Sequence, residues 1–287
     1  IKQDCKSFYA YIRSKQRSKV KIGPLKDFTG KIVTDDKQTA DLLNKYFVSV
    51  FTKEDLANIP EPIQIFVGSS NTEGLNEIEI SEELVYNKLA EINVNKCIGV
   101  DDLHPKLLYE LRDQIVKPLC ALFNLSVETA SLPQDWRDAN VTPLFKKGSR
   151  NLAENYRPIS LTSKIGKILE SIIKDNIVSH LEKFSLIRDS QHGFRKGRSC
   201  LTNLLDFMET VTRYLDEGQP VDLVYLDFAK AFDKVPFARL FKKLTSHGIG
   251  GQILEWIKQW LKNRRQHVSV NKTFLEWDEV TSGVPQG

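Results

Sequence analysis

The chain has 287 residues, of which 41% are hydrophobic and 27% are charged, and this composition suits one large folded domain or two smaller ones. No apolar run reaches the ~18 residues of a membrane-spanning helix, and the first residues, "IKQDCKSFYAY", carry charge where a signal peptide needs an apolar stretch. The four cysteines are far apart and form no CxxC pair, so we expect reduced thiols in an intracellular protein without a zinc site.

The N-terminal part predicts a helical extension and an acidic linker. Residues 1–22 are basic, contain aromatics and predict a helix, and residues 36–51 have the apolar spacing of an amphipathic helix. Residues 52–80 are acidic and interrupted by Pro and Gly, which marks the best linker candidate.

A helical block and a hairpin follow. Ser81 is a suitable N-cap, and residues 104–130 have helical spacing, with Pro118 as the expected break or kink. Residues 139–148 and 156–162 predict two strands of a hairpin whose connecting tip is basic.

Two long helices are predicted next. Residues 163–185 hold a period of 3.6, and Ser199 can cap a helix whose apolar face runs from Leu201 to Leu215. Between them lies a glycine-punctuated basic loop, "QHGFRKGRS".

The C-terminal part predicts a strand, two helices and a hairpin. The strand covers residues 221–227, and the later elements lie near 236–246, 251–263 and 266–280, the last turning near Asn271 and Lys272. The whole pattern predicts an α+β fold with helices packed on a small antiparallel sheet.

Asp227 stands at the end of an apolar strand pattern. An ionised carboxylate beside apolar residues is costly unless it is paired or bound to a metal, and a hard cation such as Mg²⁺ takes carboxylate oxygens and substrate phosphates. The competing interpretation, that Asp227 caps the segment 228–233, stays open at this stage. Asp233, just before Pro236, is expected to cap the next helix.

Charge is unevenly distributed along the chain. Residues 54–83 hold eight acidic residues and no Lys or Arg, whereas residues 1–31, 137–167 and 188–198 are strongly basic. Basic segments suit a phosphate backbone, although a solvated surface would explain any one of them alone.

Six blocks follow one another along the chain, namely "NKCIGVDDLHPKLL", "DWRDANVTPLFKKG", "NYRPISLTSKIGKILE", "QHGFRKGRSC", "VYLDFAKAFDKV" and "SGVPQG". In this order they resemble the reverse transcriptases of non-LTR retrotransposons, most closely the jockey-like group. The resemblance covers roughly residues 81–287, and residues 36–51 resemble the helix that this group carries between its endonuclease and polymerase parts.

The resemblance implies a role for particular residues. Asp227 matches the first metal-binding aspartate and the main-chain carbonyl of Phe228 a second ligand, for Mg²⁺ or alternatively Mn²⁺. Phe232 matches the aromatic under the incoming sugar, where a ring leaves no room for a 2′-hydroxyl. The other matches are Lys146 or Lys147, Arg157 and Gln286 at the nucleotide, and Gly193, Phe194, Arg195 and Arg198 at the template.

Plainer interpretations of several residues remain open. Gly193 and Gly197 would serve turn geometry alone, Phe232 would be core, and Lys146 and Lys147 would be solvated. The block "GVDD" departs from the family pattern, since Asp102 stands where the family has glycine. The family's aromatic-x-Asp-Asp motif is absent after Asp227, and both ends of the chain look cut, so we expect a fragment.

The resemblance therefore implies the fingers and a partial palm, preceded by a helical extension. The expected division is 1–80 for the extension and linker, 81–220 for the fingers and start of the palm, and 221–287 for the partial palm. The implied activity is RNA-directed DNA synthesis from deoxynucleoside triphosphates on an RNA template with a DNA primer or target, within a ribonucleoprotein of cytoplasm and nucleus. The alternative is a nucleic-acid-binding module, derived from such an element, without catalysis.

Overall fold

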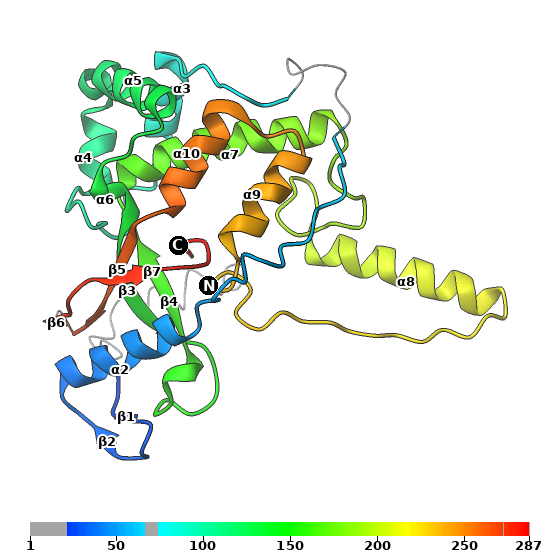
Figure 1. Ribbon diagram of the computed structural model, residues 1–287, viewed down its shortest axis with the longest axis horizontal. Helices are drawn as coiled ribbons and strands as arrows, with labels where there is room; N and C mark the ends of the chain where they lie inside the picture. Colours follow the sequence, from blue (N-terminus) through cyan, green and yellow to red (C-terminus); the bar gives the residue numbers. More distant parts are fainter. Residues whose placement is uncertain (1–21, 67–73, 272, 287) are drawn as a thin grey trace, which may run out of the picture.

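The computed structural model describes residues 22–66, 74–271 and 273–286, so the predicted helix over 1–22 lies almost wholly outside the described residues (Figure 1). Within them the predicted α+β class is confirmed. A five-stranded sheet has helices packed on either side of it, with α2 below and the α3–α7 and α9–α10 helices above in Figure 1. No helix in the described ranges has the length and apolarity needed to cross a membrane.

The central sheet is built around two strands. β3 (Asp138–Phe145) pairs with β4 (Tyr156–Leu161) as the predicted antiparallel hairpin. β5 (Arg264–Val270) pairs in parallel with β3 and antiparallel with β6 (Thr273–Phe274) and β7 (Asp278–Val280). The predicted C-terminal hairpin therefore exists, and its first strand completes the sheet that carries the first hairpin.

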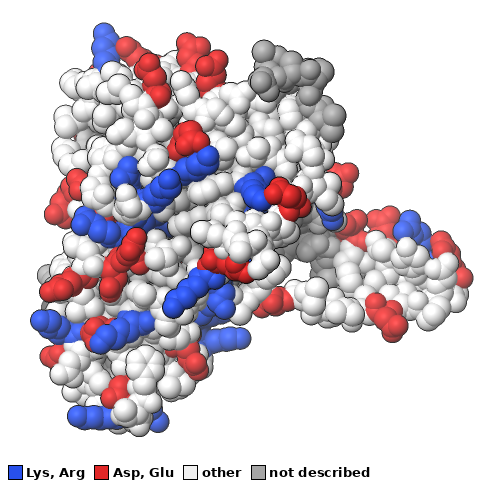
Figure 2. All heavy atoms as spheres, in the orientation of Figure 1, with Lys and Arg blue, Asp and Glu red and all other residues white. Residues whose placement is uncertain are grey.

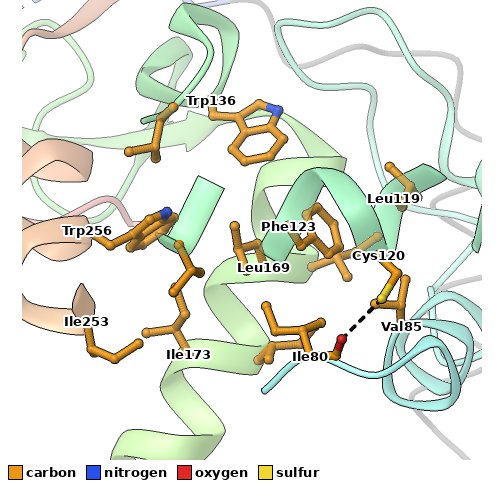
Figure 3. Close-up of a cluster of buried hydrophobic side chains, with 14 of the residues drawn as sticks. Ile80, Val85, Leu119, Cys120, Phe123, Trp136, Leu169, Ile173, Ile253 and Trp256 are labelled. Atoms are coloured by element: carbon orange, nitrogen blue, oxygen red, sulfur yellow. Dashed lines mark hydrogen bonds between the residues drawn. The ribbon is translucent and has the colours of Figure 1, made fainter. Parts of the chain in front are cut away.

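A hydrophobic core lies among the helices above the sheet. These are α3 (Glu82–Ala90), α4 (Pro105–Glu110), α5 (Arg112–Thr129), α6 (Gln134–Arg137), α7 (Lys164–Lys183), α9 (Phe237–Ser246) and α10 (Gly251–Leu261). Phe123, Leu169 and Trp256 are almost fully buried at its centre (Figure 3). Two polar groups there have partners, since Trp256 Nε1 donates to Ser126 Oγ and Cys120 Sγ donates to the carbonyl of Ile80.

One predicted helix break is in the wrong place. The interruption between α4 and α5 falls at Leu111, whose φ and ψ are −91° and 6°, and Pro118 lies inside an unbroken α5. A proline removes one backbone donor but does not end a helix whose apolar face is held by neighbours, and α5 packs on both α3 and α10.

The N-terminal elements pack against the sheet. α2 (Asp36–Ser49) confirms the predicted amphipathic helix and is capped by Asp35. Its Leu43 and Phe47 form a second core with Val268 and Val270 of β5, next to the short pair β1 (Leu25–Lys26) and β2 (Ile32–Val33). The helical extension is thus packed against β5 of the sheet.

The acidic segment after α2 runs along α9. Both carboxylate oxygens of Glu54 accept hydrogen bonds from the first amides of α9, at Ala238 and Arg239, and Glu61 forms an ion pair with Lys242. Opposite charges therefore hold the described part of the predicted linker against this helix.

α8 (Cys200–Asp216) projects from the rest of the molecule as an arm (Figure 1). Ser199 caps it as predicted, in a reciprocal pair with Thr202. None of its residues is buried, and its apolar stripe, from Leu201 to Leu215, faces solvent.

The strand predicted over residues 221–227 is wrong. This segment has no regular structure, and Val224, Tyr225 and Leu226 are 82%, 81% and 89% exposed. A strand is stable only beside another strand, and no strand of the described sheet runs next to this segment. The apolar pattern shows a preference for extended backbone and carries no information on whether a partner lies alongside.

Candidate active site

A cavity of about 510 Å³ lies between the tip of the β3–β4 hairpin, residues 227–233 and the C-terminal turn. It brings together seven residues that the sequence predicts at the metal or nucleotide, far apart along the chain. These are Lys146, Lys147, Arg157, Asp227, Phe228, Phe232 and Gln286. Convergence of residues from three separate segments makes this cavity the candidate active site.

The hairpin fixes the basic wall of the cavity. Along β4 side chains alternate between the two faces, so that Tyr156 is buried in the core and Arg157 points to the other side. The amide of Lys146 donates to the carbonyl of Asn155, which closes the strand ends, and Gly148 turns the chain with a φ of 88°. The lysines and the arginine are therefore held on a rigid two-stranded scaffold.

Asp227 lies on the opposite wall of the cavity, and its carboxylate is free to bind a ligand. Its side chain is exposed and forms no hydrogen bond or ion pair with any described residue. The alternative role as a helix cap is not realised, because residues 229–234 form turns and no helix begins there. Phe228 lies at the same rim and is largely exposed.

Phe232 lies at the edge of the cavity and belongs to neither core cluster. Its side chain is 41% exposed, and its ring meets the ring of Phe194 edge-on at a centroid distance of 6.1 Å. Its carbonyl accepts a hydrogen bond from the amide of Val284. The ring position is thus set by the backbone of the C-terminal turn.

The turn at residues 282–286 is attached to both walls. Ser282 Oγ donates to the carbonyl of Asp233, and the amide of Ser160 in β4 donates to the carbonyl of Gln286. Gly283 has a φ of 83°, and a Cβ built there would lie 2.6 Å from the carbonyl oxygen of Phe232. Glycine is required at this position both for the backbone conformation and for the close approach.

The predicted role of Asp233 as a helix cap is wrong. α9 begins after Pro236, and its free amides are capped by Glu54 from the acidic segment, a long-range partner that local spacing cannot reveal. Asp233 instead accepts a hydrogen bond of 3.0 Å from Gln286 Nε2. Burial raises the pKa of this carboxyl, although Lys230 and the Gln286 hydrogen bond oppose the shift.

Lys230 is a cavity residue that the sequence analysis missed. It lies between Asp227 and Asp233 with a φ of 55°, and its ammonium lies 5.2 Å from the ring centre of Tyr46. Burial, and then the nearby Lys146 and Arg157, lower its pKa, while Asp233 raises it. Only the fold shows that this lysine faces the hairpin, since lysines within turns are usually solvated.

The glycine-arginine block does not line the cavity. Arg195 donates to the carbonyl of Arg188, and Asp189 lies within 4.0 Å of both Arg195 and Arg198. Phe194, beside Gly193, is 93% exposed and touches Phe232. The block therefore contacts the edge of the cavity through the ring of Phe194.

The described residues provide an incomplete set of metal ligands. Among them no three His, Cys, Asp or Glu side chains are grouped as a metal site would require. Across the face shown in Figure 2, Lys and Arg side chains are interspersed with acidic ones. The cavity itself is lined by four basic side chains, Lys146, Lys147, Arg157 and Lys230, and by three acidic ones, Glu154, Asp227 and Asp233.

Comparison with known proteins agrees with this geometry. Residues 145–287 match the family model described as reverse transcriptase (RNA-dependent DNA polymerase), and every residue that lines the cavity falls within this match. The fold and the matched stretch define this part of the molecule as a reverse transcriptase domain.

Three curated relatives come from Drosophila melanogaster. The probable RNA-directed DNA polymerase from transposon BS is 22% identical over 98% of this chain and 31% of its own length. The RNA-directed DNA polymerase from mobile element jockey is 27% identical over 72% of this chain and 23% of its own length. The probable RNA-directed DNA polymerase from transposon X-element is 28% identical over 67% of this chain and 21% of its own length. By this domain and these relatives, the chain is similar to the reverse transcriptases of jockey-like non-LTR retrotransposons. It spans about a third or less of the length of these relatives.

Proposed function

We propose that this chain supplies the nucleotide-binding part of an RNA-directed DNA polymerase, which extends a DNA 3′ end on an RNA template. The observation that carries the proposal is the cavity in which three cationic side chains of the hairpin lie opposite the free carboxylate of Asp227, with Lys230 on the same wall as that aspartate. A deoxynucleoside triphosphate has complementary chemistry, with a polyanionic tail for the cations and a sugar that can lie against the ring of Phe232.

The hairpin acts on the triphosphate in this proposal. Arg157 presents a planar fork that can bind two phosphate oxygens at once, and Lys146, Lys147 and Lys230 add positive charge around it. Charge that develops on the phosphates in the transition state is stabilised by cations already in place. Both hairpin lysines line the cavity, so either can contact phosphate.

Asp227 and the carbonyl of Phe228 would hold a divalent cation, Mg²⁺ or Mn²⁺, which would neutralise charge on the substrate phosphates. The Asp227 carboxylate fits this role because it has no partner among the described residues. One carboxylate is fewer than two-metal phosphoryl transfer uses, so we propose that residues 1–287 alone do not polymerise.

The template side of the proposal rests on the basic loop 188–198. Phe194 offers an exposed ring for stacking a base, and Arg195 and Arg198 lie beside it. Binding of RNA or of an RNA–DNA hybrid through phosphates would weaken steeply with salt. The parent enzyme would act in a ribonucleoprotein of the cytoplasm and nucleus.

Binding of a fluorescent deoxynucleoside triphosphate to the chain, in the presence of Mg²⁺, tests the nucleotide site. Arg157→Ala should weaken binding by roughly tenfold or more, the size of a lost charge-assisted contact. Arg213→Ala, which removes an arginine from the projecting α8, is the matched control. Equal affinity in the two variants would contradict the proposal.

A binding module without catalysis is the second candidate, because the described residues contain no group of three metal ligands. Primer extension on an RNA template separates the two, using the longer parent polypeptide with and without Asp227→Asn. Synthesis that is abolished by Asp227→Asn with RNA binding retained supports the polymerase. No synthesis by the unaltered parent polypeptide supports the binding module.

A further inference from the structure

A second cavity, of about 300 Å³, lies between α3, the loop that follows it and the first half of α7. Lysines approach it from all three elements, namely Lys88 from α3, Lys96 from the loop, and Lys164 and Lys167 from α7. It shares no lining residue with the candidate active site. Its chemistry therefore needs a separate explanation.

Three of these four lysines form no ion pair with any residue that the structure describes. Lys88 is neutralised by Asp175 at 2.6 Å and has Glu91 at 3.9 Å. Within the described parts of the chain, Lys96, Lys164 and Lys167 form no salt bridge.

The carboxylates whose charge acts on Lys164 and Lys167 already accept hydrogen bonds from other groups. The Asp101 carboxylate, which acts on Lys164, accepts hydrogen bonds from the backbone amides of Leu103 and Lys164. The Glu170 carboxylate, which acts on Lys167, accepts a hydrogen bond from Trp260 Nε1 and also faces Arg264. Among the described residues, the charges of Lys96, Lys164 and Lys167 are thus left without an ion-pair partner, and Glu91, the one acidic residue that lines the cavity, lies beside Lys88.

The positive charges of the cavity lysines repel one another, which destabilises the folded chain. Lys164 and Lys167 are three residues apart on a helix, so their side chains share a face, where like charges destabilise. Burial lowers the pKa of both, and the charge of Lys96 lowers each further. A bound anion would remove this repulsion, because each ammonium would gain a partner of opposite sign.

We propose that this cavity binds a phosphate group through Lys96, Lys164 and Lys167, as a free anion or as part of a nucleic acid backbone. Ser171, which lines the same cavity, offers a hydroxyl donor. A cavity of about 300 Å³ has room for a phosphate with part of its hydration shell. The first amides of α7 take little part, since Asp101 and Ser163 already accept from Lys164 N and Gly166 N.

The test compares a cavity variant with a matched control of equal charge. The cavity variant is Lys164→Gln/Lys167→Gln, and the control is Lys117→Gln/Lys262→Gln, which removes two exposed lysines from α5 and the end of α10. Titration calorimetry with inorganic phosphate measures the free anion, and fluorescence anisotropy with a labelled single-stranded RNA measures the backbone phosphate. Each is run on the full chain.

We expect the cavity variant to lose roughly tenfold or more in affinity for at least one probe, relative to the control. Loss with inorganic phosphate identifies a free-anion site, and loss with RNA alone identifies a backbone contact. Equal affinities of the two variants for both probes would overturn the proposal. If the double variant does not fold, Lys96→Gln on the exposed loop replaces it, with Lys117→Gln as its control. Arg157→Ala leaves this cavity unchanged, so failure here is distinct from failure of the proposed nucleotide site.

Discussion

Gln286 Nε2 donates a hydrogen bond of 3.0 Å to the carboxylate of Asp233, across 53 residues of chain. The same glutamine accepts a hydrogen bond at its carbonyl from the amide of Ser160 in β4. One residue therefore connects the hairpin wall of the candidate active site to its acidic wall. The position of Gln286 at the cavity depends on an aspartate that the sequence analysis had assigned to a different role.

Asp233→Asn should stabilise the folded chain relative to the unaltered protein, and this gain should be larger near neutral pH than near pH 4. Burial raises the folded-state pKa of Asp233 above its ordinary value of 3.8, so folding favours the protonated form. The contribution of Asp233 to the free energy of unfolding is fully present below its pKa in the unfolded chain. It is lost as the pH rises through its pKa in the folded chain. Asparagine is neutral throughout and keeps an oxygen that can accept from Gln286.

Urea unfolding of both proteins at several pH values between 3.5 and 7.5 measures this difference, in a range chosen to bracket the ordinary carboxyl pKa. Asp222→Asn, at an exposed position in the irregular segment before the cavity, is the control. A difference in unfolding free energy that stays constant with pH would show that Asp233 titrates as in the unfolded chain.

Gly283→Ala should destabilise the folded chain by about 2–4 kcal/mol, because the substitution adds both a strained backbone and a steric clash. The residue has a φ of 83°, and an added Cβ would lie 2.6 Å from the carbonyl oxygen of Phe232 and 2.7 Å from that of Asp233. Gly218→Ala is matched in φ, at 72°, with nothing within 4 Å of its Cβ, and should cost only about 1 kcal/mol. Denaturant unfolding compares the two, and equal costs would mean that the turn can move away from residues 232–233.

The sequence allowed prediction of elements whose signals are local. The caps at Ser81 and Ser199, the β3–β4 hairpin and α7 depend on neighbouring residues or on a helical period, and each is present. The strand at 221–227 and the cap at Asp233 were wrong because both depend on which distant segment lies alongside. Lys230 was missed for the same reason, as its cavity position results from the packing of two walls.

Asp102→Gly should leave the stability unchanged or raise it by up to about 1 kcal/mol. Asp102 has a φ of 53°, in the left-handed region that glycine adopts freely and aspartate tolerates. This explains how the chain accommodates a residue where the family pattern has glycine. Its neighbour Asp101 anchors the loop instead, by accepting from the amide of Lys164.

Thermal or urea unfolding of Asp102→Gly and Asp102→Val measures the backbone effect. Valine, which is branched at Cβ, should cost about 1–3 kcal/mol at this φ. If the glycine variant were less stable by more than about 1 kcal/mol, the Asp102 side chain would have to make a stabilising contact of its own.

Phe232→Val should reduce the preference for deoxynucleotides over ribonucleotides. The ring lies at the edge of the cavity, held by the Val284–Phe232 backbone hydrogen bond and by contact with the ring of Phe194. If the sugar of a bound nucleotide lies against this ring, a smaller side chain leaves space for a 2′-hydroxyl, whereas the phosphate contacts of Arg157 stay unchanged.

Competition between a deoxynucleoside and a ribonucleoside triphosphate for the chain measures the preference. The ratio of the two dissociation constants should fall by roughly tenfold in Phe232→Val, mainly through tighter ribonucleotide binding. Phe228→Val, at the same rim but 85% exposed, is the matched control and should keep the ratio of the unaltered chain. An unchanged ratio in Phe232→Val would assign its ring to packing against Phe194 and the C-terminal turn, and the residue that selects the sugar would have to lie elsewhere.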